Sequence, residues 1–140
     1  MATISINSQV QPIDPKLVTK IMLPDGTQMP QVAMGTFHSD NPDLIKGMED
    51  IVIEAIRLGY RHIDCATAYQ NEEVVGRALN KAFDKGLVKR EELFVLSKLW
   101  NKHMNRDLVI KACEDSLHML GLEYLDMYWC IGHGLIFMSR

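Results

Sequence analysis

The chain has 140 residues, of which 47% are hydrophobic and 24% are charged, and its formal net charge is -3. These values are typical of a soluble globular domain, and the scattered lysines and arginines exclude the basic surface that a nucleic acid requires. No apolar run approaches the roughly 20 residues that span a bilayer, and residues 1–20 lack the features of a secretory signal. We therefore expect a cytoplasmic protein without a nucleic-acid or membrane partner.

The cysteines and histidines do not indicate a disulfide framework or a metal site. The three cysteines are odd in number and share no CxxC spacing, so we expect reduced thiols that pack as small apolar side chains. Four histidines show no spacing typical of metal ligands, and we predict no metal site. The residues concerned are Cys65, Cys113 and Cys130, and His38, His62, His103 and His118.

The first predicted element is a small β-hairpin. Apolar residues 21–23 and 29–32 flank the turn-forming sequence of residues 24–27, which contains Pro24 and Gly26. A short strand over residues 32–37 and a polar loop over residues 38–42 follow. The polar segment before residue 20 carries no recognised motif, and we expect a flexible or packing role for it.

Two helices and one strand are predicted next. Apolar residues at three- and four-residue spacing predict an amphipathic helix over residues 43–58, which Gly59 ends. Residues 60–66 are strand-like. Asn71 is placed to cap a second helix that extends to Gly86, with Glu72 and Glu73 in its first turn.

The remaining elements repeat this alternation. A strand over residues 93–98 and a loop over residues 100–105 precede a third helix, which Asn105 caps and Gly121 ends. Its inward stripe includes Leu108 and Ser116, and residues 122–131 form a fourth strand. Strands that alternate with helices indicate parallel βαβ units, because each crossover requires a helix, and the predicted class is α/β.

Several motifs of the chain resemble the aldo-keto reductase family. They fall in the family's order and at its spacing over roughly residues 20–128. The segments are Met29-Pro30, Gly35 to Phe37, Gly59 to Ala66, Tyr69 with Asn71-Glu72 and Val75-Gly76, Leu96 to Asn101, Ser116 to Leu120, and Tyr124 to Tyr128.

The resemblance implies a (β/α)₈ barrel of the TIM-barrel type, present here as an incomplete half barrel with about four parallel strands and three helices after the hairpin. It also implies NADPH-dependent reduction of aldehydes and ketones to alcohols, with a small carbonyl compound as substrate. Tyr69 would be the catalytic acid, Lys98 would activate it, and Asp64 would hold Lys98 through a partly buried ion pair. In a parallel barrel these residues lie at the C-terminal ends of the strands, where such barrels carry out chemistry.

The resemblance also assigns binding roles. Gly35, Thr36, Phe37 and Asp64 would contact the nicotinamide end of the cofactor, and Trp100 would form an aromatic wall of the substrate pocket. Taken singly, each of these residue types is more often a helix cap, a solvated charge or packing material than a functional group. Packing at the barrel edge is the alternative role for Trp100.

The family pattern ends near the last predicted strand. The place of the family's substrate-orienting histidine holds Ile131, and His133 comes two residues later, a displacement of roughly 6 to 7 Å along a strand. We assign His133 no family role. The expected organisation is an arm (residues 1–20), a partial barrel domain (21–131) and a divergent tail (132–140). The alternative to an enzyme is a truncated, non-catalytic fragment that acts as an interaction module and self-associates through the open barrel edge.

Overall fold

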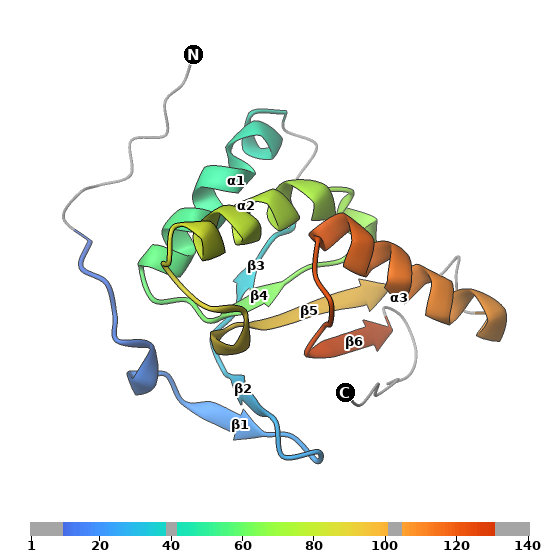
Figure 1. The fold of residues 1–140 in the computed structure, drawn as a ribbon, viewed down its shortest axis with the longest axis horizontal. Coiled ribbons are helices and arrows are strands. Elements are labelled where there is room, and N and C mark those ends of the chain that lie inside the picture. The colour runs from blue at the N-terminus through green and yellow to red at the C-terminus, as the bar shows by residue number, and fades with distance from the viewer. Residues whose placement is uncertain (1–9, 39–41, 101–104, 131–140) are drawn as a thin grey trace.

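The computed structural model describes residues 10–38, 42–100 and 105–130 (Figure 1). Helices and strands alternate along most of the described chain, as the sequence predicts. In chain order the elements are η1 (Pro15–Leu17), β1 (Lys20–Met22), β2 (Gln28–Pro30), β3 (Met34–Gly35), α1 (Pro42–Arg57), β4 (His62–Asp64), η2 (Thr67–Tyr69), α2 (Glu72–Asp84), η3 (Arg90–Glu92), β5 (Phe94–Leu99), α3 (Arg106–Leu120) and β6 (Met127–Cys130), where η is a 3₁₀ helix.

Strands β3 to β6 form one parallel sheet in sequential order, and β1 and β2 form a separate antiparallel hairpin. All three α-helices lie on the same face of the parallel sheet (Figure 1). Sequential order with helices on one face is the arrangement of a barrel wall, whereas a doubly wound sheet carries helices on both faces. The prediction of a hairpin followed by four parallel strands and three helices is confirmed.

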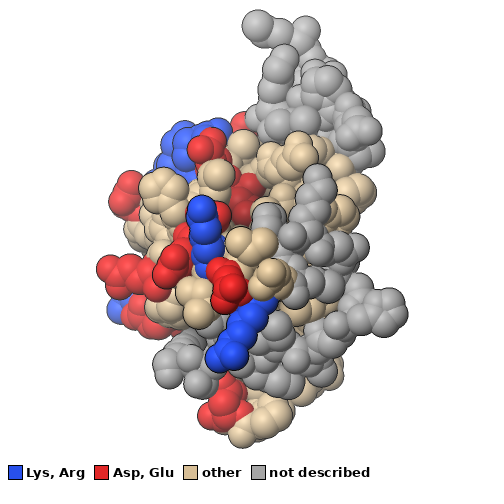
Figure 2. All heavy atoms as spheres, turned by 90° about the vertical axis from the view of Figure 1, so that its right-hand side faces the viewer, with Lys and Arg blue, Asp and Glu red and all other residues tan. Residues whose placement is uncertain are grey.

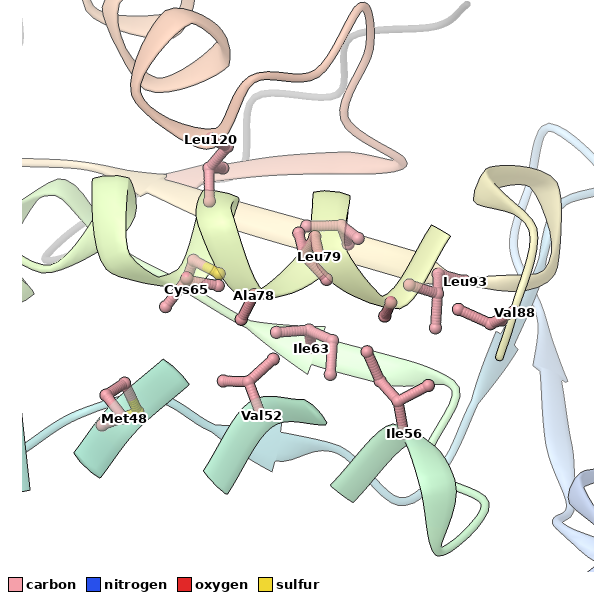
Figure 3. Close-up of a cluster of buried hydrophobic side chains, with 13 residues drawn as sticks. Met48, Val52, Ile56, Ile63, Cys65, Ala78, Leu79, Val88, Leu93 and Leu120 are labelled. Carbon is pink, nitrogen blue, oxygen red and sulfur yellow. The ribbon is translucent and has the colours of Figure 1, made fainter. Parts of the chain in front are cut away.

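The main core lies between this sheet and the first two helices. In Figure 3, Val52 and Ile56 of α1 point toward Ile63 of β4, and Ala78 and Leu79 of α2 approach it from the other helix. All five of these residues are at most 1% exposed. Their burial provides the hydrophobic free energy that holds both helices on the sheet.

The opposite face of the sheet is covered at its N-terminal end by the hairpin. Phe94 and Leu96 of β5 and Met127 of β6 pack there against Leu23 and Met29. Alternate residues of β5 therefore serve different faces, because successive side chains of a strand point in opposite directions. The face away from the helices, here called the inner face, therefore carries every second side chain of β5, including Phe94 and Leu96.

Two glycines permit close contacts between chain segments. Gly76 of α2 lies so close to the end of α3 that a Cβ atom there would be 2.6 Å from the Leu120 carbonyl oxygen. Gly59 follows α1 with a φ of +107°, and the Ile13 amide donates to the Leu58 carbonyl at 3.0 Å beside it. The second contact shows that the part of the arm around Ile13 packs against the domain.

Some predicted details are wrong. The strands β3, β4 and β6 are shorter than predicted, because apolar residues beside them lie in connecting turns and do not pair with a neighbouring strand. For example, the amide of Tyr60, before β4, donates to the Ala55 carbonyl of α1 at 3.0 Å. Helix α2 ends at Asp84 rather than Gly86, and Leu108 of α3 is 38% exposed instead of facing inward. In the described part of the chain, no helix has the length and apolar character needed to cross a bilayer.

Candidate active site

Two charged side chains meet at the C-terminal edge of the parallel sheet. Asp64 is the last residue of β4, Lys98 is near the end of β5, and these neighbouring strands run in the same direction. The Lys98 ammonium forms an ion pair with Asp64 Oδ1, and the two side chains are 15% and 31% exposed. Parallel strands end at the same edge of a sheet, and this edge is where α/β barrels place their active sites.

The Lys98 ammonium also contacts the phenol of Tyr69. Lys98 Nζ lies 3.1 Å from Tyr69 Oη and 3.0 Å from the Cys65 carbonyl oxygen, in addition to the Asp64 carboxylate. An ammonium group has three N–H donors and no acceptor, so these three partners account for all of them. The Tyr69 oxygen therefore accepts from Lys98, and its own O–H remains able to donate elsewhere.

The end of β3 adds a flat apolar surface beside the phenol. Gly35 pairs with Asp64 in the sheet, and the amide and hydroxyl of Thr36 both donate to the Asp64 carbonyl oxygen, at 3.0 and 2.9 Å. Phe37 then packs edge-on against the Tyr69 ring with centroids 5.2 Å apart, although the Phe37 side chain is 67% exposed. The sequence-predicted residues from β3, β4, η2 and β5 are thus brought together.

The turn that carries Tyr69 is held by residues that follow it. Gln70 has φ 53° and ψ 31°, the left-handed conformation that is uncommon for residues other than glycine. Asn71 is 1% exposed and donates through Nδ2 to the Thr36 carbonyl at 2.7 Å. Asn71 occupies the N-cap position of α2, as predicted, but its side chain makes no capping bond, because its amide group donates to the residue that follows β3 instead.

Glu72, the first residue of α2, is buried rather than exposed. Its Oε1 accepts from the Ser97 hydroxyl at 2.6 Å and its Oε2 from the Ser116 hydroxyl at 3.3 Å, and Ser116 Oγ lies 3.0 Å from Thr67 Oγ1. Burial raises the pKa of the Glu72 carboxyl, and the hydrogen bonds from the serine and threonine hydroxyls oppose that rise. This cluster is not predicted from the sequence, although Ser116 in the inward stripe of α3 is a signal for a buried polar partner.

Other sequence-predicted residues have a less direct relation to the site. Trp100 directly follows β5 and is half-buried. His62 lies on the buried inner side of the sheet, where Nδ1 donates to the Pro30 carbonyl at 2.8 Å and burial lowers the pKa of the imidazole. Ile131, His133 and His103 lie outside the described residues. Within the described ranges, no group of three or more potential ligands among histidine, cysteine, aspartate and glutamate is arranged for a metal ion.

The candidate site and a separate hollow lie at opposite ends of the sheet. A hollow of about 960 Å³ lies at the N-terminal ends of the strands, where Arg61, Phe94 and Asp126 line it together with the arm and the hairpin. Figure 2 views the side toward which β5 and β6 run, and acidic and basic side chains are interspersed over its described part. The combination of ion pair, phenol and exposed aromatic ring is found at the C-terminal edge, opposite the hollow.

The fold and the site together define an α/β-barrel protein in which a phenol, an ammonium group and a carboxylate meet at the C-terminal edge of the sheet. Comparison with known families agrees, since the model of the aldo/keto reductase family matches residues 32–131. The chain belongs to the aldo/keto reductase family.

Individual relatives are similar over most of this chain. Aldose reductase C of Dictyostelium discoideum is 44% identical over 106 residues, which are 76% of this chain and 32% of that protein. An aldo-keto reductase of Bombyx mori is 48% identical over 110 residues, which are 77% of this chain and 36% of that protein. The chain therefore spans about a third of the length of these curated relatives.

Solved structures give the same fold. The crystal structure of a Bombyx mori aldo-keto reductase in complex with NADP has a TM-score of 0.77 and 46% identity, and the match covers 81% of this chain and 38% of that one. An aldo-keto reductase complexed with NADPH also has a TM-score of 0.77, at 30% identity, with 81% and 36% of the two chains covered. The four parallel strands and their helices are a partial (β/α)₈ barrel.

Proposed function

We propose that this chain carries the proton-donating part of an NADPH-dependent reductase of aldehydes and ketones. The observation that carries the proposal is the environment of Tyr69. Its oxygen accepts a hydrogen bond from Lys98, whose other two N–H groups are taken by Asp64 and by the Cys65 carbonyl. The phenolic proton is therefore the one that a substrate oxygen would receive.

Each residue would have a separate part in proton transfer. Tyr69 would donate its proton to the carbonyl oxygen as negative charge develops there, which is general acid catalysis. The Lys98 ammonium would stabilise the phenolate that remains, since an opposite charge in contact favours the ionised form. Asp64 would keep Lys98 directed at the phenol, because their ion pair fixes the end of a long and otherwise mobile side chain.

The residues present fit the nicotinamide end of the cofactor. The exposed Phe37 ring beside Tyr69 offers an apolar surface for a flat ring, and the Asp64 carboxylate is partly accessible next to it. When bound, the reduced nicotinamide supplies the hydride for carbonyl reduction. Gly35, Thr36, Phe37 and Asp64 would hold that end close to Tyr69. Relatives support this choice of cofactor, including the structures named as complexes with NADP and NADPH.

Trp100 would form one wall of the substrate pocket. It follows Lys98 by two residues and is half-buried at the same edge of the sheet. An indole ring there would exclude water from the carbonyl group and would favour substrates with an apolar part.

The test joins residues 1–130 to the remaining C-terminal part of the Bombyx mori relative and follows NADPH consumption with a small aromatic aldehyde. We expect Tyr69→Phe to reduce kcat by about a hundredfold to ten-thousandfold, the usual contribution of a general acid, with little effect on the Kd for NADPH. Tyr60→Phe is the matched control, since Tyr60 is an exposed tyrosine. If Tyr69→Phe kept a tenth of the parental kcat, Tyr69 would not be the acid.

A second candidate function is a non-catalytic interaction module that self-associates through the sheet edge. The observation that favours it is β6, which among the described strands pairs only with β5 and exposes Trp129 to 42%. Exposed edge strands with large apolar side chains recruit further strands. Sedimentation of the 140-residue chain tests this candidate: it requires a dimer that Trp129→Lys converts to a monomer.

A further inference from the structure

The buried carboxylate of Glu72 connects the two elements that carry the candidate catalytic pair. Ser97, one of its donors, is the residue before Lys98 in β5. Thr67 begins the 3₁₀ turn Thr67–Tyr69, and it reaches Glu72 through the hydroxyl of Ser116. The carboxylate therefore lies on a continuous chain of hydrogen bonds from the Tyr69 turn to the Lys98 strand.

The position of Glu72 is not explained by helix stability alone. A carboxylate in the first turn of a helix is favourable, but Glu73 also occupies that turn and is exposed. Glu72 is 5% exposed, and its hydrogen-bond partners among the described residues are hydroxyl groups rather than a lysine or arginine. Burying a carboxylate without a cation is costly, and an apolar residue would pack there at lower cost.

The groups around the Glu72 carboxylate include one segment that also contacts the Lys98 ammonium. The negative charge of Glu72 adds to the rise in pKa that burial causes at Cys65, which directly follows β4, at Cys113 of α3 and at Tyr128 of β6. The Cys65 carbonyl is itself one of the three acceptors of the Lys98 ammonium. Glu72 thus lies on the helix side of the sheet, on the face opposite the ammonium, and its hydrogen bonds reach β5 and α3.

We propose that Glu72 is a positioning residue, which holds the Thr67–Tyr69 turn in place relative to β5 and so fixes the contact between Tyr69 and Lys98. The inference rests on the proposed function, because it assumes that this contact is the one used in proton transfer. The backbone conformation of Gln70 explains why the contact between Tyr69 and Lys98 needs support. Its left-handed conformation directly after Tyr69 is unfavourable for a residue with a side chain, and the bonds of Asn71 and Glu72 on the next two residues hold it.

The test uses the 140-residue chain and needs no enzymatic activity. Tyrosine labelled with ¹³C at Cζ gives an NMR signal that responds to hydrogen bonding at the phenol oxygen, and Tyr69→Phe identifies the signal of Tyr69. Lys98→Met defines the shift that accompanies loss of the Lys98 contact. We expect Glu72→Ala to move the Tyr69 signal by at least half of that shift, and Glu72→Gln, which keeps an acceptor, to move it less.

Two further variants separate positioning from general stability. Glu73→Gln is the control for a change of charge in the same helical turn, and it should leave the Tyr69 signal unchanged. Thr67→Val removes the hydroxyl at the start of the Tyr69 turn with little change in volume, and it decides the question if Glu72→Ala does not fold. We expect it to move the Tyr69 signal while the urea midpoint of unfolding changes little.

The outcomes distinguish the inference from the proposed function. If Lys98→Met moved the Tyr69 signal but Glu72→Ala and Thr67→Val left it unchanged, the positioning role would be wrong and the proposed function would stand. If Lys98→Met itself left the Tyr69 signal unchanged, the contact on which the proposed function depends would be absent, and both would fail.

Discussion

Replacing Gly76 by alanine sets two effects of opposite sign against each other. In an exposed helix the change is stabilising by up to about 1 kcal/mol, because alanine has the higher helix propensity. In this chain the new Cβ atom would lie 2.6 Å and 2.7 Å from the carbonyl oxygen and carbon of Leu120 and 2.7 Å from the carbonyl oxygen of Met119. Ordinary contact begins at 3.4 Å, so the end of α3 would have to move by about 0.8 Å.

Because the crowded atoms are backbone atoms, no change of rotamer relieves the contact. Overpacking costs about 1–3 kcal/mol, and the upper part of that range, about 2–3 kcal/mol, applies here because three backbone atoms are crowded. After a gain in propensity of up to about 1 kcal/mol, we expect a net loss of about 1–2 kcal/mol in the free energy of unfolding. With an m-value of about 2 kcal/mol per molar, the urea midpoint would fall by about 0.5–1 M.

The assay is urea unfolding followed by far-UV circular dichroism, with Arg77→Ala as the control. Arg77 is the next residue of α2, and its side chain, which pairs with Glu49, is 56% exposed. Because exposed ion pairs contribute little, the free energy of unfolding of Arg77→Ala should stay within about 0.5 kcal/mol of the parent value. A midpoint for Gly76→Ala equal to or above that of the parent would refute the close α2–α3 contact.

Two other predictions concern titratable side chains. Burial lowers the pKa of His62 below its ordinary value, so the unfolded chain binds the proton more readily than the folded one. The free energy of unfolding should therefore fall as the pH decreases below about 6.5, and His62→Gln should weaken this dependence in urea titrations at several pH values. Burial raises the pKa of Cys65 to about 12, so its thiol should resist iodoacetamide at pH about 8. Mass spectrometry should find it labelled quickly only after unfolding, and equal rates in both states would contradict its complete burial.

The elements that the sequence predicts well are those with strong local signals. The apolar stripes of the three helices set their approximate positions, and Asn105 caps α3 through a bond to the Asp107 amide at 3.2 Å, as predicted. The class of fold follows from the alternation of strands and helices. The family motifs then indicate which strands end beside one another, and the structure brings Asp64, Tyr69 and Lys98 into contact at that edge.

The parts that were not predicted depend on residues distant in sequence. Glu72 has the residue type and position of an exposed first-turn carboxylate, and it is buried only because Ser97 and Ser116, 25 and 44 residues away, arrive on either side of it. Asn71 has the residue type of a cap, yet Thr36, 35 residues earlier, provides the acceptor that its amide group uses. In both cases the local sequence pattern predicts the start of the helix but not the distant residue to which the side chain bonds.

The alternation along β5 has a consequence for how this segment can change in evolution. Ser97 faces the helices and Lys98 faces the opposite side, so two adjacent residues serve the Glu72 cluster and the Tyr69 contact. Substitutions at either position affect one face only. Insertion or deletion of a single residue before Ser97 would exchange the faces, placing an ammonium group in the helix layer and a hydroxyl at the site. Homologous sequences should therefore vary in residue type along β5 while keeping its length constant.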